Sequence, residues 1–172
     1  MLLSRLGPAL ADAALELRLP ARATCAIVFN SGVMRKAPYG RRIDAHDVVF
    51  RMNMLNRSGH DVFLGTRWTH EFVSFQKPLD GYACPADKFA ALAPPRIVGL
   101  SFERHSPRDC DRHPVCCRDR VLGRHSNWVL LPEAFTTECR GLVVGTHLSQ
   151  CSSGFATALL ATRECANVTV FG

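Results

Sequence analysis

Two short polar segments contain residues that suit an anionic or hydroxyl-rich ligand. In the first, Asn30 and Ser31 follow the apolar run 25–29, and Asn53 follows the run 47–52. An amide side chain both donates and accepts hydrogen bonds, so it fits a ribose hydroxyl, a phosphate oxygen or a base edge. Asparagine after a strand is also an ordinary turn former, and for either residue alone that interpretation stays open.

The second segment is the run Ser152, Ser153 and Gly154, which precedes the apolar stretch 155–164. A serine in this position typically caps a helix. The first N–H groups of a helix and its dipole favour a phosphate at that end. As a bare pattern this is weak, because most such turns only cap their helix.

The elements that must position these residues alternate along the chain. We expect strands at 25–29, 47–52, 72–75, 96–101, 127–131, 141–144 and 167–171, and helices at 9–19 and 155–164. The charged, cysteine-rich stretch 103–126 predicts a surface loop. This alternation favours one layered α/β domain, and open α/β sheets bind ligands at the carboxyl ends of their strands.

Composition and charge narrow the class of protein. The chain has 172 residues, 47% of them apolar, and a formal net charge of +6. Its basic residues indicate either a solvated surface or attraction of an anionic substrate. No basic stripe with interleaved aromatics marks a nucleic-acid-binding face. No stretch reaches the 18 or so apolar residues of a membrane span, so any anchor lies outside the sequence.

Eight cysteines are many for a chain of this size. In an oxidising compartment they predict disulfides, and in the cytosol buried thiols or metal ligands. The sequons at Asn56 and Asn167 are candidate glycosylation sites, which fits a secretory lumen. The histidines and cysteines of 105–117 match no common zinc-finger spacing, so we expect no metal site.

The segment 25–53 resembles the large sialylmotif of the sialyltransferases of glycosyltransferase family 29. The resemblance covers an opening cysteine, an apolar strand, Asn-Ser-Gly, a later glycine, Ile-Asp-x-His-Asp and Arg-x-Asn. Its matching residues are Cys25, Asn30, Ser31, Gly32, Gly40, Ile43, Asp44, His46, Asp47, Arg51 and Asn53. Phe29 departs from the pattern, because a small residue usually precedes the asparagine, and its ring could crowd the nucleotide pocket.

Two further segments continue the resemblance. The stretch 61–70 is similar to the segment after the large motif, and its role is either a packed loop or donor contact. The stretch 151–172 resembles the small sialylmotif, with Cys151 in place of the usual proline. The resemblance implies a Cys25–Cys165 disulfide. The pairing of the other cysteines stays open; they are Cys84, Cys110, Cys116, Cys117, Cys139 and Cys151.

The resemblance implies a Rossmann-like, layered α/β/α nucleotide-binding sheet, the GT-A-like variant of sialyltransferases, truncated at its C-terminus. Residues 1–24 would form a short helix and linker, and 25–172 a partial catalytic domain with motifs at 25–70 and 151–172. The donor would be CMP-sialic acid, bound by Asn30, Ser31, Asn53, Ser152, Ser153 and Gly154. A structural role is expected for Gly32, Asp44, His46, Asp47 and Arg51, although a carboxylate–imidazole cluster also suits acid–base chemistry.

The reaction implied is transfer of sialic acid to a glycan hydroxyl with inversion, without a metal or other cofactor. The family's general base is a histidine in a motif beyond the small sialylmotif, and the sequence contains neither that motif nor the short one before it. We therefore expect a fragment or degenerate relative that has no catalytic residue and no transfer activity alone. The alternative is a non-catalytic CMP-sugar-binding module. The resemblance places the protein in the Golgi lumen or membrane.

Overall fold

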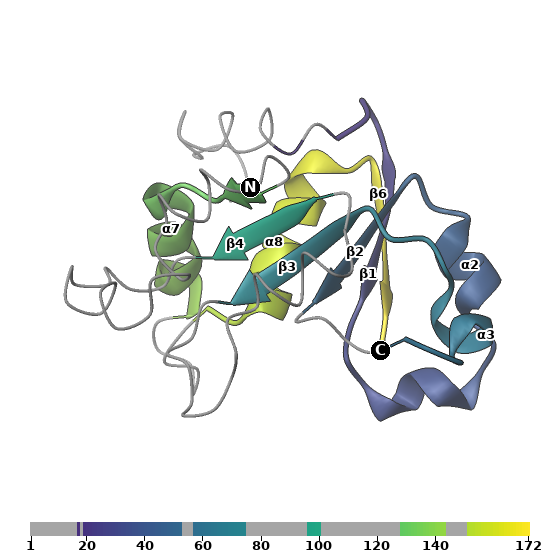
Figure 1. Cartoon of the computed structure of the whole chain (residues 1–172). Coiled ribbons are helices and arrows are strands. Elements are labelled where there is room, and N and C mark those ends of the chain that lie inside the picture. Colours follow the sequence, from purple (N-terminus) through teal and green to yellow (C-terminus); the bar gives the residue numbers. More distant parts are fainter. Residues whose placement is uncertain (1–16, 18, 53–56, 75–95, 101–127, 144–150) are drawn as a thin grey trace.

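The computed structural model describes residues 17, 19–52, 57–74, 96–100, 128–143 and 151–172 (Figure 1). Most of the predicted helix 9–19 and all of the predicted loop 103–126 lie outside these residues. Asn53, Asn56, Cys84 and the histidines and cysteines of 105–117 also lie outside these residues.

A six-stranded parallel sheet forms the centre of the molecule, with the strand order β5-β4-β3-β2-β1-β6 (Figure 1). The layered α/β class predicted from the sequence is confirmed. The strands are β1 (Thr24–Val28), β2 (Val48–Met52), β3 (His70–Ser74), β4 (Ile97–Leu100), β5 (Trp128–Leu130) and β6 (Asn167–Phe171). Six of the seven predicted strands are therefore present, with ends that differ from the predicted ones by at most two residues.

Helices cover both faces of this sheet. One face carries the 3-10 helix η1 (Gly32–Lys36), α2 (Gly40–Asp44) and α3 (Asp61–Leu64), and the other carries α7 (Glu133–Val143) and α8 (Ser153–Glu164). β1 shows why two layers form, because Ala26 and Val28 face the first group while Cys25 and Ile27 face the second. Successive side chains of a strand point to opposite faces, so an unbroken apolar run needs cover on both.

The predicted strand at 141–144 is wrong, because residues up to Val143 belong to helix α7. Phe135, Cys139 and Val143 are buried and lie four residues apart, which is the repeat of a helix. Considered alone, the short run from residue 141 resembles a strand. Considered together with residues 133–140, it is the last turn of one helix.

The chain changes direction across the sheet at β1. From β1 it proceeds outward through β2, β3 and β4 to β5, and it then returns by way of α7 and α8 to β6 on the opposite side of β1. In open α/β sheets, such a reversal leaves a crevice outside the carboxyl ends of the two strands, and ligands bind there. The switch point of this fold therefore lies between β1 and β6.

Within the described parts of the chain, no helix has the length and apolar character needed to cross a bilayer. Likewise, the described residues contain no group of three histidine, cysteine or acidic side chains arranged to hold a metal ion.

Candidate donor-nucleotide site

Residues from four elements meet at the carboxyl edge of the sheet, next to the switch point. Phe29 and Asn30 follow β1, Met52 ends β2, Gly172 follows β6, and Gly154 lies in the first turn of α8. The Nδ2 atom of Asn30 donates a hydrogen bond of 2.8 Å to the carbonyl oxygen of Met52. Asn30 therefore joins the ends of β1 and β2 while its side chain faces solvent.

The two predicted serines at the start of α8 have different roles. Ser152 is the N-cap, and its Oγ accepts a hydrogen bond of 3.1 Å from the N–H of Phe155. Ser153 begins the helix and is buried. The N-terminus of a helix is the positive end of its dipole, so an anion is favoured at such an end.

Ser31 and Gly32 follow Asn30 at the same edge. The Oγ of Ser31 accepts a hydrogen bond of 3.3 Å from the N–H of Val33, which makes Ser31 the N-cap of η1. A Cβ atom at Gly32 would meet open space. The structure gives no steric reason for glycine at this position.

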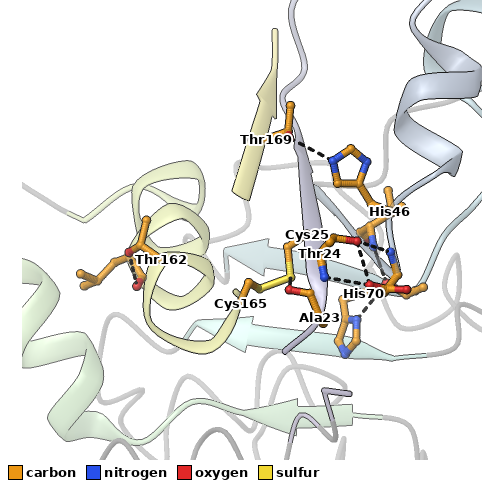
Figure 2. Close-up of a disulfide and its surroundings, with 12 residues drawn as sticks. Ala23, Thr24, Cys25, His46, His70, Thr162, Cys165 and Thr169 are labelled. Atoms are coloured by element: carbon orange, nitrogen blue, oxygen red, sulfur yellow. Dashed lines mark hydrogen bonds between the residues drawn. A yellow bond between two sulfur atoms is a disulfide. The ribbon is translucent and has the colours of Figure 1, made fainter. Parts of the chain in front are cut away.

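A disulfide joins Cys25 in β1 to Cys165, the residue after α8, as the family resemblance implied (Figure 2). The two Cα atoms are 6.0 Å apart, and 140 residues separate the cysteines in sequence. The bond ties β1, the strand next to the sheet edge, to the C-terminal end of α8. It thereby fixes the two motif-like segments against each other, and with them the helix that points its N-terminus at the switch point.

A second disulfide, between Cys139 and Cys151, joins α7 to the residue before the N-cap of α8. Both cysteines are buried. Glu138 and Arg163 form an ion pair between the same two helices, with Nη2 and Oε1 2.5 Å apart. Sequence reasoning left this pairing open, because connectivity cannot be deduced from cysteine spacing alone. Cys151, the departure from the family's proline, thus anchors the start of α8.

The carboxylate of Asp44 holds the loop after α3. Its Oδ2 accepts from the N–H of Thr66 at 2.9 Å, and its Oδ1 accepts from the N–H of Arg67 at 2.8 Å. Partial burial by itself raises the pKa of Asp44, but these hydrogen bonds outweigh it and leave the pKa below its ordinary value. Gly65 has φ +69°, and a Cβ there would lie 2.3 Å from Oδ1 of Asp44, so the close approach requires glycine.

Asp47 and His46 also make contacts within the fold, and Figure 2 shows His46 directed toward Thr169. Asp47 accepts from the N–H and the hydroxyl of Thr24 at 2.8 and 2.7 Å, and these bonds lower its pKa. His46 lies 2.9 Å through Nδ1 from the carbonyl oxygen of Arg42, and 3.0 Å through Nε2 from the hydroxyl of Thr169. His46 therefore connects α2 to β6.

Arg51 is a buried cation whose partners are backbone carbonyls. Its Nη2 donates to the carbonyl oxygens of Leu64 at 2.7 Å and Arg67 at 2.8 Å. Burial, and then the nearby Arg57, lower its pKa to about 10, so it stays charged at neutral pH. For the segment 61–70, the packed-loop interpretation is the one that these contacts support.

This polar network lies apart from the carboxyl edge. Thr24 begins β1 and Asp47 precedes β2, so both lie at the amino ends of these strands. For strands of this length, that is roughly 16 Å from the carboxyl edge. His46 lies on the face covered by α2, because it contacts the ring of Phe171, whereas α8 covers the other face. The position of Asp44, His46 and Asp47 therefore does not suit acid–base chemistry on a ligand bound at the N-terminus of α8.

Asn167 is exposed at the start of β6, at the amino edge of the sheet. The other sequon, at Asn56, lies outside the described residues, as does the predicted ligand-binding residue Asn53.

A parallel sheet with helices on both faces and a helix N-terminus at its switch point defines the class of open α/β proteins. Within that class, residues 3–79 match the family model described as glycosyltransferase family 29 (sialyltransferase). The predicted resemblance to this family is thus confirmed over the N-terminal part of the chain.

Curated relatives match the chain over stretches of similar length. The chain is 42% identical over 71 residues to the human CMP-N-acetylneuraminate-beta-galactosamide-alpha-2,3-sialyltransferase 1, covering 41% of this chain and 21% of the relative. It is 34% identical over 78 residues to the mouse CMP-N-acetylneuraminate-beta-galactosamide-alpha-2,3-sialyltransferase 2, and the match covers 45% of this chain and 21% of the relative. The chain therefore spans about a fifth of the length of these relatives.

The likeness in structure extends further than the likeness in sequence. The crystal structure of a mammalian sialyltransferase has a TM-score of 0.62 with 21% identity, over 98% of this chain and 66% of the other. A second crystal structure, in complex with Gal-beta-1-3GalNAc-ortho-nitrophenol, has a TM-score of 0.65 with 22% identity. This match covers 95% of this chain and 62% of the other. The shared fold thus includes α8 and β6, which lie beyond the matched sequence.

Proposed function

We propose that this chain is the donor-binding part of a sialyltransferase. The protein would transfer sialic acid from CMP-sialic acid to a glycan hydroxyl with inversion, and the CMP would be bound at the carboxyl edge between β1, β6 and α8. One observation carries this proposal. The two segments that resemble the sialylmotifs meet at the switch point, and at the other end of α8 the Cys25–Cys165 disulfide fixes this helix against β1.

The phosphate of CMP would lie at the N-terminus of α8. Ser152 caps this helix, and the first-turn N–H groups, around Ser153 and Gly154, provide donors to an anion. Asn30 and Ser31, with Asn53, would bind the nucleoside from the ends of β1 and β2. Backbone donors and a helix dipole can stabilise the departing phosphate without a metal ion, in keeping with transfer that needs none.

In the reaction, the acceptor oxygen would attack the anomeric carbon of sialic acid. The bond from that carbon to the phosphate oxygen breaks, and CMP leaves with the electron pair. A base takes the acceptor's proton. We place residues 25–172 in the partial catalytic domain and the protein in the Golgi, where it would meet glycan acceptors.

Binding of CMP tests the donor site directly. Isothermal titration calorimetry of the chain with CMP should show one site, and Asn30→Ala and Asn53→Ala should each weaken it by about tenfold, the effect of one hydrogen bond to a polar ligand. Asn167→Ala is the matched control, because Asn167 is exposed at the opposite edge of the sheet. Equal weakening by all three variants, or no binding by the parent chain, would refute the site.

A second candidate is a non-catalytic module that binds a CMP-sugar. The contacts of two described histidines favour it. Both nitrogens of His46 and both nitrogens of His70 contact protein atoms, so neither ring is placed to take a proton from an acceptor. A radiolabelled CMP-sialic acid assay decides between the candidates, because only the first predicts that a chain extended beyond residue 172 transfers the label.

A further inference from the structure

Phe29 lies at the switch point itself. It follows β1, and its N–H donates a hydrogen bond of 2.8 Å to the carbonyl oxygen of Phe171, which extends the β1–β6 pairing to the carboxyl edge. Its side chain is on the α8 face of the sheet and packs, partly buried, against the core there. A large aromatic side chain therefore stands where the fold leaves its ligand crevice.

Two glycines make room for Phe29, Gly154 beside its ring and Gly172 beside its Cβ atom and backbone. A Cβ atom at Gly154 would lie 2.5 Å from Cε1 and 3.2 Å from Cδ1 of Phe29. A Cβ at Gly172 would lie 2.8 Å from the Cβ of the same residue. Because a Cβ points toward the N-terminus of its helix, the ring edge beside Gly154 lies on the side of α8 where the helix begins.

That position coincides with the place proposed for the donor phosphate. An anion reaches the first-turn N–H groups of a helix from its N-terminal end, and an aromatic ring there offers no hydrogen-bond donor and removes space. We propose that Phe29 restricts access of a nucleotide phosphate to the N-terminus of α8 and thereby sets the chain's affinity for nucleotides. This inference rests on the proposed function.

Calorimetric titration of four chains with CMP and with cytidine tests the proposal. Phe29→Ala should raise the affinity for CMP by about tenfold, and that for cytidine by less than about threefold, because only CMP carries the phosphate. Phe29→Leu, which keeps an apolar side chain, should fall between the wild type and Phe29→Ala. Leu159→Ala is the matched control, since Leu159 also packs partly buried from α8, more than one turn from Gly154, and it should change neither affinity.

Each outcome has a separate meaning. If Phe29→Ala weakens both ligands, the ring is a stacking platform for the base and the proposal is overturned. If all four chains bind CMP equally, the proposal is overturned while donor binding stands. If no chain binds CMP at millimolar concentration, the proposed function fails, and the inference fails with it.

A double-mutant cycle checks the Phe29–Gly154 contact without any ligand. In the wild-type background, Gly154→Ala should lower the melting temperature, because its methyl group meets the ring. In the Phe29→Ala background the same change should raise the melting temperature by about 2 °C, because alanine is the better helix former. An equal shift in both backgrounds would show that the ring does not lie on α8.

Discussion

The Nε2 atom of His70 lies 3.2 Å from the carbonyl oxygen of Leu17, a residue 53 positions earlier in the chain. Both residues are buried. This contact brings the segment before β1 against the start of β3, and it does so through a neutral imidazole, because burial lowers the pKa of His70 to about 4.

The pKa of His70 predicts a loss of stability in mild acid. Since the ordinary value is 6.5, the unfolded chain binds a proton between pH 6.5 and 4 that the folded chain does not. The free energy of unfolding is therefore highest above pH 6.5, where His70 is neutral in both states, and it falls as the pH drops toward 4. Lowering the pH from 7 to 5 should therefore reduce the free energy of unfolding by about 2 kcal/mol through this residue.

Urea unfolding at both pH values measures this effect. His70→Gln keeps an N–H donor without a titratable ring, so it should show a difference between the two pH values that is smaller by about 2 kcal/mol. His60→Gln, at a partly exposed histidine, should retain the wild-type difference. An unchanged pH dependence in His70→Gln would mean that the imidazole is not desolvated.

Arg51 should be among the most sensitive positions in the N-terminal half. Arg51→Met removes a buried cation and leaves the carbonyl oxygens of Leu64 and Arg67 without these donors, so we expect a loss of about 3 kcal/mol in urea unfolding. Arg51→Lys keeps the charge but cannot reach both carbonyls in the same geometry. It should lose less than Arg51→Met, and the reverse order would contradict the hydrogen-bond account.

Asp44→Asn tests the loop contact at Thr66 and Arg67. The amide group has the shape of the carboxylate but only one oxygen, so one of the two backbone N–H groups loses its acceptor, at a cost of about 1 kcal/mol. Because hydrogen bonding lowers the pKa of Asp44, the stabilisation is present above the ordinary pKa and is lost as the pH falls below it. The difference between wild type and variant, measured by urea unfolding at pH 7 and pH 3, should therefore shrink in acid.

The two disulfides should contribute unequally. The Cys25–Cys165 bond closes a loop of about 140 residues and the Cys139–Cys151 bond a loop of about 12. In the chain-entropy account these lengths correspond to about 5 and about 3 kcal/mol. Guanidinium unfolding of the two double cysteine-to-serine variants should give that order. The reverse order would locate the stabilisation in contacts around α7 and α8 rather than in loop closure.

The sequence predicts most of the sheet because its strands are continuous apolar runs between polar turns. Cys25 to Phe29 is of this kind, Val48 to Met52 is apolar except for Arg51, and Ser152 marks the start of α8 directly. The error at 141–144 arose because four apolar residues have no period of their own, and the helix shows only in the spacing of Phe135, Cys139 and Val143.

Other features depend on contacts between distant segments. The Cys139–Cys151 pair needs α7 packed beside α8, and the hydrogen bond from Asn30 to Met52 needs β1 and β2 in register. The departure at Phe29 was visible in the sequence, but its position against Gly154 and Gly172 was not. Whether Asn30, Ser31 and the serines of α8 bind a donor stays a prediction.

The pairing of β1 with β6 has a consequence for synthesis of the chain. Thr24 is aligned with Asn167, so β1 is made early, while one of its two partner strands comes about 140 residues later. At ordinary translation rates that interval is on the order of ten seconds. Throughout it the nascent chain exposes an unpaired, apolar strand edge, which is a hazard for association with other chains. Chaperone cover during this interval should therefore matter more for this protein than for one whose sheet grows in chain order.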